Sequence, residues 1–334
     1  MCIPLGAHFE LTKRCNLGCY HCYVVHDGDE MPTQRWLELV DEVAEAGCLS
    51  VTLTGGEVCL RDDWMQIAKA VRRARMVVSV FTNGTLLDDA AMDQLAELVP
   101  AVVSISLYGA DAASHDAVTL APGSFDRSMR SLVGLRERGV RCRVSTVLMR
   151  GTFDEYPAVK RLADELGCTF SFDYTVSPCE NGDPSPTRHR MDEAQLRALV
   201  AGTDSPLEAI EAEAGRHGAQ PGRGRSASCG AGRSRGWIGA DGSLLPCMGL
   251  PPIGSVRERP FAEVWRSDAA ARVRERLSQP EGECVDCGLA HWCTAWCPRL
   301  ALYEDGNMSG HAGRACHIAE LTRERWASVH AGAV

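Results

Sequence analysis

Stretches with the composition of β-strands alternate with stretches of helical periodicity along the first half of the chain. Apolar, β-branched runs predict strands at 7–11, 49–54, 76–81, 101–107, 141–148 and 168–175. Apolar residues at helical spacing predict helices at 33–46, 63–75, 88–98, 124–138 and 153–166. Strands joined by helices pair in parallel through right-handed crossovers, so we expect an α/β fold, either an open doubly wound sheet or a barrel.

The composition limits the class of protein. With 334 residues and 45% hydrophobic content, the chain suffices for one large core and a smaller second module. Its net charge of -9 argues against general binding to nucleic acid or to an anionic membrane surface. No signal peptide and no apolar run of the ~20 residues that span a bilayer is found, so we expect a cytoplasmic protein. Its 16 cysteines then indicate metal binding or redox chemistry, because the cytosol does not maintain disulfides.

Cys15, Cys19 and Cys22 follow the first predicted strand at short spacing. One loop with this spacing presents three thiolates to a single iron–sulfur cube and leaves the fourth iron without a protein ligand. That iron is then open to a small molecule. Half of a tetrahedral zinc site is the alternative, because cysteines two residues apart also suit zinc.

This cysteine loop resembles that of the radical S-adenosylmethionine (radical SAM) enzymes, and further motifs of that family follow in order at 54–57, 82–84 and 104–107. The resemblance implies a partial (β/α)6 radical SAM barrel, whose active site lies at the C-terminal ends of the strands. It implies S-adenosylmethionine (SAM) as cofactor, bound at the [4Fe–4S] cluster of the three cysteines. The cofactor contacts that it implies are His21, Gly55, Gly56, Glu57, Asn83 and Ser106.

Three of these contacts carry further expectations. Gly55 and Gly56 are expected where the backbone approaches a ligand so closely that a Cβ would obstruct it. Relatives often have an arginine for the cofactor carboxylate where this chain has Thr119, which makes Ser106 the candidate for that contact.

The second half of the chain contains a second cysteine pattern that resembles the SPASM extension of radical SAM enzymes. That extension carries two auxiliary [4Fe–4S] clusters. Carried over, the first would be held by Cys229, Cys247 and Cys297, and the second by Cys284, Cys287, Cys293 and Cys316. Some relatives have a further cysteine where this chain has Arg223, so the first auxiliary cluster is expected to lack a fourth cysteine. A zinc ribbon is the alternative for Cys284 and Cys287.

Changes of composition divide the chain into domains. We expect the radical SAM barrel at 1–190, a helix and linker at 191–225, and the SPASM domain with a C-terminal helix at 226–334. The linker contains a Pro- and Gly-rich segment with several arginines, which is either a solvated connection or a contact for an acidic or phosphorylated group.

The resemblance implies a reaction class. The reduced first cluster would cleave SAM to a 5′-deoxyadenosyl radical, which abstracts hydrogen from an unactivated C–H bond in natural-product maturation. We expect epimerisation or dehydrogenation of an aminoglycoside- or cyclitol-type small molecule or of a peptide, with an external one-electron donor such as flavodoxin or ferredoxin. The alternatives are a ribosomal-peptide maturase that forms a thioether or C–C crosslink, and a noncatalytic iron–sulfur or zinc protein. Cys15 lies close to the first residue, so we expect no leader-binding domain before it.

Four residues are candidates for catalysis beyond the clusters. Cys179 follows the sixth predicted strand, where its thiol would donate a hydrogen atom to a substrate radical and so complete an epimerisation. An inert loop cysteine is the alternative. Cys59, Asp173 and Tyr108 are further candidates near the ends of predicted strands, and each could equally be structural.

Overall fold

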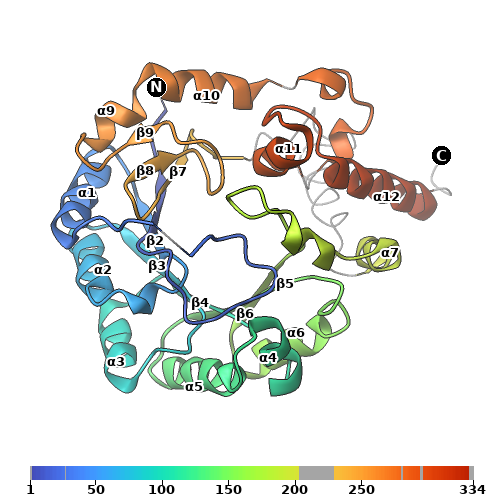
Figure 1. The fold of residues 1–334 in the computed structure, drawn as a ribbon. Helices are drawn as coiled ribbons and strands as arrows, with labels where there is room; N and C mark the ends of the chain where they lie inside the picture. Colours follow the sequence, from blue (N-terminus) through green and yellow to red (C-terminus); the bar gives the residue numbers. More distant parts are fainter. Residues whose placement is uncertain (1, 27, 203–228, 280, 294–295, 331–334) are drawn as a thin grey trace. The chain divides into compact units, whose positions relative to one another are not determined.

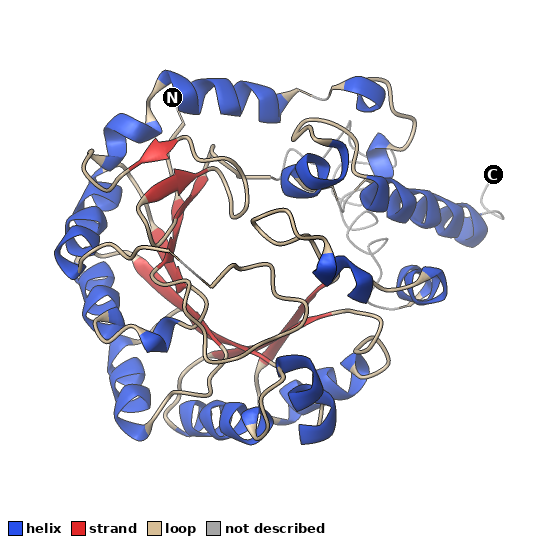
Figure 2. Ribbon diagram, viewed as in Figure 1, coloured by secondary structure: helices blue, strands red, loops and turns tan. Residues whose placement is uncertain are grey.

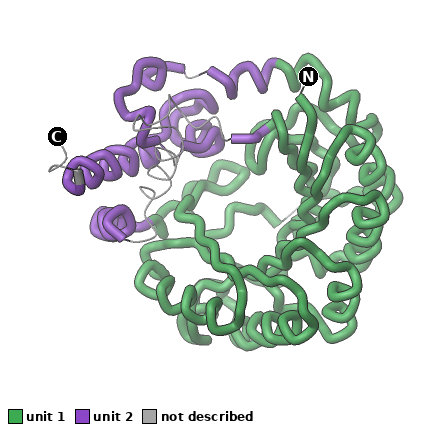
Figure 3. The backbone as a smooth tube through the Cα atoms, turned by 180° about the vertical axis from the view of Figure 1, so that it is seen from behind, with its two compact units in different colours: residues 1–190, 232–271 green, residues 191–231, 272–334 purple. Residues whose placement is uncertain are grey.

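The computed structural model describes all residues except 1, 27, 203–228, 280, 294–295 and 331–334. The chain forms two compact units (Figure 3). The first contains residues 1–190 and 232–271, and the second contains residues 191–231 and 272–334. No helix in the described residues is long and apolar enough to cross a membrane.

The first unit contains one nine-stranded sheet in the order β6-β5-β4-β3-β2-β1-β7-β8-β9. The strands of its parallel part are β1 (Gly6–Glu10), β2 (Ser50–Thr54), β3 (Val77–Thr82), β4 (Val102–Ser106), β5 (Cys142–Val147) and β6 (Thr169–Asp173). All neighbours from β1 to β6 pair in parallel, and Figure 1 shows them as a curved wall. The α/β fold and the partial barrel are thereby confirmed, and the open doubly wound sheet is not formed.

Helices cover the outer side of this wall (Figure 2). They are α1 (Thr33–Glu45), α2 (Trp64–Arg73), α3 (Asp89–Leu98), α4 (Ala112–Thr119), α5 (Ser124–Glu137) and α6 (Tyr156–Glu165). Outward side chains of the strands, such as Phe9, Leu53 and Ile105, are fully buried beneath them. Every second strand residue therefore faces the barrel interior.

Three further strands extend the sheet beyond β1: β7 (Arg235–Ile238), β8 (Ser243–Leu245) and β9 (Gly254–Ser255). β7 pairs in parallel with β1, while β8 and β9 add antiparallel. Helix α9 (Phe261–Trp265) follows, and the indole of Trp265 donates to the carbonyl of Cys2 at 2.9 Å. Residues 232–271, which the sequence assigns to the C-terminal domain, belong to the barrel unit because of this strand pairing.

The second unit is mainly helical. Its helices include α7 (Glu193–Ala201), α11 (Pro298–Asp305) and α12 (Gly313–His330), while α10 (Asp268–Ser278) begins at the end of the first unit. Short 3₁₀ turns in the chain are η1 (Val58–Leu60), η2 (Ser185–His189), η3 (Gly282–Cys284) and η4 (Ala290–Trp292). Most of the expected linker, including Arg223, lies outside the described residues.

Candidate functional site

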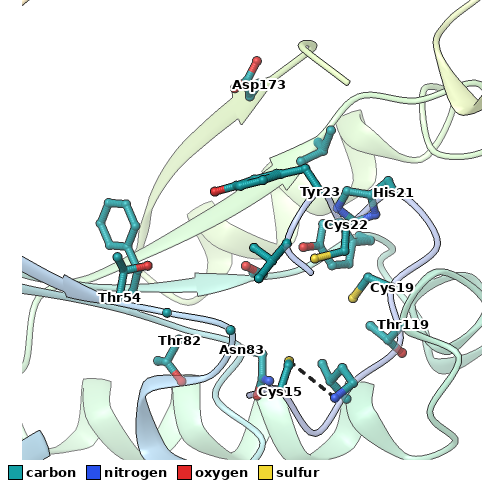
Figure 4. Close-up of a pocket in the computed structure, with 18 of the residues that line it drawn as sticks. Cys15, Cys19, His21, Cys22, Tyr23, Thr54, Thr82, Asn83, Thr119 and Asp173 are labelled. Atoms are coloured by element: carbon teal, nitrogen blue, oxygen red, sulfur yellow. Dashed lines mark hydrogen bonds between the residues drawn. The ribbon is translucent and has the colours of Figure 1, made fainter. Parts of the chain in front are cut away.

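A cavity of about 270 Å³ lies at the C-terminal ends of the barrel strands (Figure 4). The last residues of five consecutive strands line it: Thr54, Thr82, Ser106, Val147 and Asp173. The remaining lining comes largely from the cysteine loop, residues 11–24, that follows β1. The predicted residues that the structure brings together here are Cys15, Cys19, His21, Cys22, Gly55, Gly56, Asn83, Ser106, Tyr108 and Asp173.

The three thiols of the cysteine loop surround one open space (Figure 4). A turn closed by the bond from the Cys22 amide to the Cys19 carbonyl, 3.0 Å long, brings two of them together. Burial, together with the neighbouring thiols of Cys22 and Cys15, raises the pKa of the Cys19 thiol to about 12. Burial likewise raises the pKa of Cys15. Three crowded, half-buried thiols are stable as thiolates only beside a cation, so this donor set fits an iron–sulfur cluster.

Gly55 and Gly56 lie directly against the cysteine loop. A Cβ on Gly55 would lie 2.4 Å from the carbonyl oxygen of Thr12, and one on Gly56 would lie 2.3 Å from that of Arg14. The Gly56 amide donates to Thr12 at 2.8 Å. Both glycines line the cavity, but the close approach that requires them is to the cysteine loop itself.

Glu57 is buried and is absent from the cavity lining. Its carboxylate accepts hydrogen bonds from the Thr82 hydroxyl at 2.6 Å and from the Asn83 amide at 2.7 Å. Burial raises its pKa, and these bonds act against that rise. Glu57 therefore acts as a positioning residue that joins the ends of β2 and β3. Asn83 does line the cavity, and its side chain donates to Asn16 of the cysteine loop at 2.9 Å.

Aromatic rings form one wall of the cavity. The rings of His21 and Tyr108 meet edge-on at 4.8 Å between centroids, and Tyr108 stacks on His115 at 5.7 Å. Burial lowers the pKa of both histidines to about 4, so both are neutral at physiological pH. The Tyr108 amide donates to His115 Nδ1 at 3.1 Å, and His115 Nε2 has no protein partner among the described residues. The sequence analysis did not identify His115 as a lining residue of the cavity.

Thr119, the position where the resemblance gives many relatives an arginine, lines the cavity. The Thr119 hydroxyl is buried and bonds to the Ser124 hydroxyl at 2.7 Å. Asp116 fixes the same turn by accepting from the amides of Gly123 and Phe125. Ser106 lies on the cavity wall, where a carboxylate of a bound cofactor could reach it.

The two candidate catalytic thiols lie outside the cavity lining. Cys59 packs 3.9 Å from the Thr82 hydroxyl, and burial strongly raises its pKa. Cys179 lies against the cysteine loop, where its thiol donates to the carbonyl of Cys22 at 3.6 Å. The backbone amide of the next residue, Glu180, donates to the Tyr23 carbonyl. The carboxylate of Glu180 forms an ion pair with Lys13 at 2.8 Å. The segment that carries Cys179 is thus fixed to the loop of the first three cysteines.

Glu10 was not identified from the sequence. It is the last residue of β1 and pairs in register with the cavity residue Thr54, so its side chain faces the barrel interior. Burial raises its pKa to about 7, and the charges of Glu180 and Asp241 contribute. Alternation along the strand could have indicated that the Glu10 side chain faces the interior. Its burial could not be predicted in this way, because it depends on β7, where the Trp237 side chain bonds to Glu10.

The C-terminal cysteines of the second unit fall into groups. Burial raises the pKa of Cys316, on α12, and the nearby Cys284 and Cys287 raise it further. Burial also raises the pKa of Cys297, with a contribution from Cys229. Cys316 thus lies near Cys284 and Cys287, and Cys297 lies near Cys229. Cys293 is half-buried beside Trp292, and Cys247 belongs to the first unit.

Comparisons with known proteins agree with this site. Residues 9–163 match the family model of the radical SAM superfamily, and residues 229–288 match that of SPASM, an iron–sulfur cluster-binding domain. An AdoMet-dependent heme synthase of Methanosarcina barkeri is 28% identical, covering 85% of this chain and 87% of the relative. A PqqA peptide cyclase of Granulibacter bethesdensis is 25% identical, with 95% and 90% covered.

Solved structures share the fold. Streptococcus suis SuiB bound to its precursor peptide SuiA matches 95% of this chain and 76% of that chain, with a TM-score of 0.73 at 19% identity. At this identity the likeness concerns the architecture of barrel and C-terminal extension.

Proposed function

The chain belongs to the radical SAM family and carries a SPASM domain, with SAM and [4Fe–4S] clusters, auxiliary ones included, as its cofactors; on this premise we propose that it is an oxidoreductase or epimerase acting on a small hydroxylated natural product. The observation that carries this proposal is the cavity in which Cys15, Cys19 and Cys22 meet the ends of five strands.

Cys15, Cys19 and Cys22 would hold the first cluster, which would supply one-electron chemistry for the cleavage of SAM. The chain's own residues position and protect the reaction. Gly56 and Glu57 fix the cysteine loop against the sheet through bonds to its carbonyls. The rings of His21 and Tyr108 make one wall apolar and help to exclude water.

We assign two further residues to the substrate. Asp173 lines the cavity, and its Oδ1 accepts from the Thr175 amide at 2.7 Å, which fixes the carboxylate. We assign to Asp173 Oδ2 the binding of a substrate amine or hydroxyl. Cys179 is proposed as the hydrogen-atom donor in an epimerisation, because its thiol lies against the loop of the three cysteines. A flavodoxin or ferredoxin would provide the electrons.

A peptide substrate is the second candidate. It is supported by curated relatives such as the PqqA peptide cyclase and a mycofactocin maturase of Mycolicibacterium smegmatis. The reaction would then be a crosslink or another modification of a ribosomal peptide.

Anaerobic reconstitution with iron and sulfide tests the proposed activity. We expect a brown protein that cleaves SAM to 5′-deoxyadenosine when reduced, and a Cys15→Ala, Cys19→Ala, Cys22→Ala variant that does not. A protein that binds zinc, shows no visible absorption and leaves SAM intact would instead support the noncatalytic alternative.

A further inference from the structure

A chain of hydroxyl groups crosses the inner face of the barrel. Ser104 on β4 bonds to Ser145 on β5 at 2.8 Å between the oxygens, and Ser145 bonds to Ser171 on β6 at 2.9 Å. Arg143 donates through Nε to the Ser104 hydroxyl at 3.1 Å. Ser145 and Ser171 are register partners in the parallel sheet, so their side chains lie on the same face.

Arg143 determines the direction of this chain. A guanidinium only donates hydrogen bonds, so Ser104 accepts from it and its own hydrogen is directed elsewhere. Ser104 is only 4% exposed, and Ser145 is the acceptor that the structure gives it. The bond between Ser145 and Ser171 uses the hydrogen of one of these two hydroxyls. The hydrogen of the other has no acceptor among the residues that the structure describes.

That hydrogen is available to a second cavity of about 180 Å³, which Ser145 and Ser171 line together with Asp173. Ser106 and Tyr108 line both this cavity and the one beside the three cysteines, so the two adjoin. The hydroxyls of Ser106 and Tyr108 also bond to each other. This bond uses only one of their two hydroxyl hydrogens, so the other is available to a ligand. The second cavity therefore offers two donors beside the carboxylate of Asp173.

Arg143 has no carboxylate partner among the described residues. Its guanidinium lies 5.1 Å from the ring centroid of Phe81, and burial lowers its pKa. A half-buried cation without an acid partner is uncommon in a protein interior. Its contact with Ser104 assigns it the role of a positioning residue that keeps the hydroxyl chain donating toward the cavity.

We propose that the chain Ser104–Ser145–Ser171, oriented by Arg143 and facing Asp173, is the substrate subsite for a hydroxylated, amine-bearing ring of the amino-sugar or aminocyclitol class. The two donors bind ring oxygens, and Asp173 binds the ammonium group. Val147 and Phe172 complete the lining with apolar surface for the ring carbons. This inference deepens the proposed function and rests on it.

The test uses the reconstituted protein with SAM and radiolabelled glucosamine in anaerobic equilibrium dialysis. Ser145→Ala and Ser171→Ala are expected to raise the dissociation constant about three- to tenfold, the effect of losing one hydrogen bond. Ser79→Ala is the matched control, because Ser79 lies on β3 and makes no side-chain hydrogen bond among the described residues; its dissociation constant should stay within about twofold of the wild type.

Arg143→Met should weaken glucosamine binding to the same extent as Ser145→Ala, while Arg143→Lys, which keeps a donor, should restore most of it. Equal affinities of the Ser145→Ala and Ser79→Ala variants, no retention of glucosamine by the wild type, or tighter binding of trialanine than of glucosamine would each overturn the subsite. Wild-type protein that cleaves SAM but does not retain glucosamine refutes the subsite alone. Retention of glucosamine without SAM cleavage refutes the proposed function alone.

Discussion

Gly56 lies against the carbonyl group of Arg14 so closely that a Cβ on Gly56 would stand 2.3 Å from the carbonyl oxygen. The amide of the next residue, Glu57, donates to the same oxygen at 2.8 Å. The end of β2 thus holds the cysteine loop in place through backbone contacts, and the position of the three thiols depends on a residue without a side chain.

A methyl group at position 56 should therefore displace the cysteine loop. We expect Gly56→Ala to lose the first cluster on reconstitution and to retain the auxiliary ones, so that iron falls from about twelve to about eight atoms per chain. Gly18→Ala is the matched control in the same loop, because its Cβ would meet no atom closer than 3.9 Å. Equal iron contents in the two variants would show that this contact does not position the thiols.

Glu57→Gln tests the bonds between β2 and β3. The amide of glutamine cannot accept all the bonds that the carboxylate accepts from Thr82, Asn83 and Cys59. We expect the free energy of unfolding in urea to fall by about 1–3 kcal/mol. The exposed Glu38→Gln variant should change it by less than about 1 kcal/mol. A Glu57→Gln variant as stable as the Glu38→Gln variant would contradict the positioning role.

Glu10 should make the stability of the protein depend on pH. Its folded pKa of about 7 lies above the usual glutamate value of 4.5, so the folded state binds its proton more tightly than the unfolded state. The associated stability is complete below about pH 4.5 and is lost as the pH rises through about 7, by an amount on the order of 3 kcal/mol.

Glu10→Gln, which stays neutral, should abolish this loss. Thermal melts at pH 6 and pH 9 should therefore show the variant gaining stability relative to the wild type at the higher pH. A difference in melting temperature between the variant and the wild type that is the same at both pH values would contradict the raised pKa of Glu10.

Cys179 is tested by the fate of solvent hydrogen. In D2O, with the substrate that the enzyme converts, the wild type should place deuterium in the epimerised product, because a thiol exchanges its hydrogen with water. Cys179→Ala should lose this label and accumulate unquenched or oxidised product, while Cys59→Ala should keep it, since Cys59 packs against Thr82 outside the cavity lining. Labelled product from Cys179→Ala would remove this thiol from the mechanism.

The sequence predicts the barrel well because its parallel strands are buried, continuous apolar runs. For example, the run at 49–54 corresponds to β2 (Ser50–Thr54). The helix α4 (Ala112–Thr119) was missed because it is short and lacks a clear apolar stripe, and β7 because four residues give no periodicity.

The cysteine motifs predict which residues gather at the cavity, but side-chain roles depend on contacts that are distant in sequence. The requirement for Gly56 comes from Arg14, and the burial of Glu10 depends on Trp237 of a strand added after residue 230. The hydroxyl chain depends on the register of β4, β5 and β6, which no local pattern specifies.

The most direct test of the central claim is electron paramagnetic resonance of the reduced, reconstituted protein with and without SAM. If Cys15, Cys19 and Cys22 hold a cluster with an open iron, SAM should shift the signal of that cluster, and the Cys15→Ala, Cys19→Ala, Cys22→Ala variant should show no shift. A wild-type spectrum that SAM leaves unchanged would contradict the account.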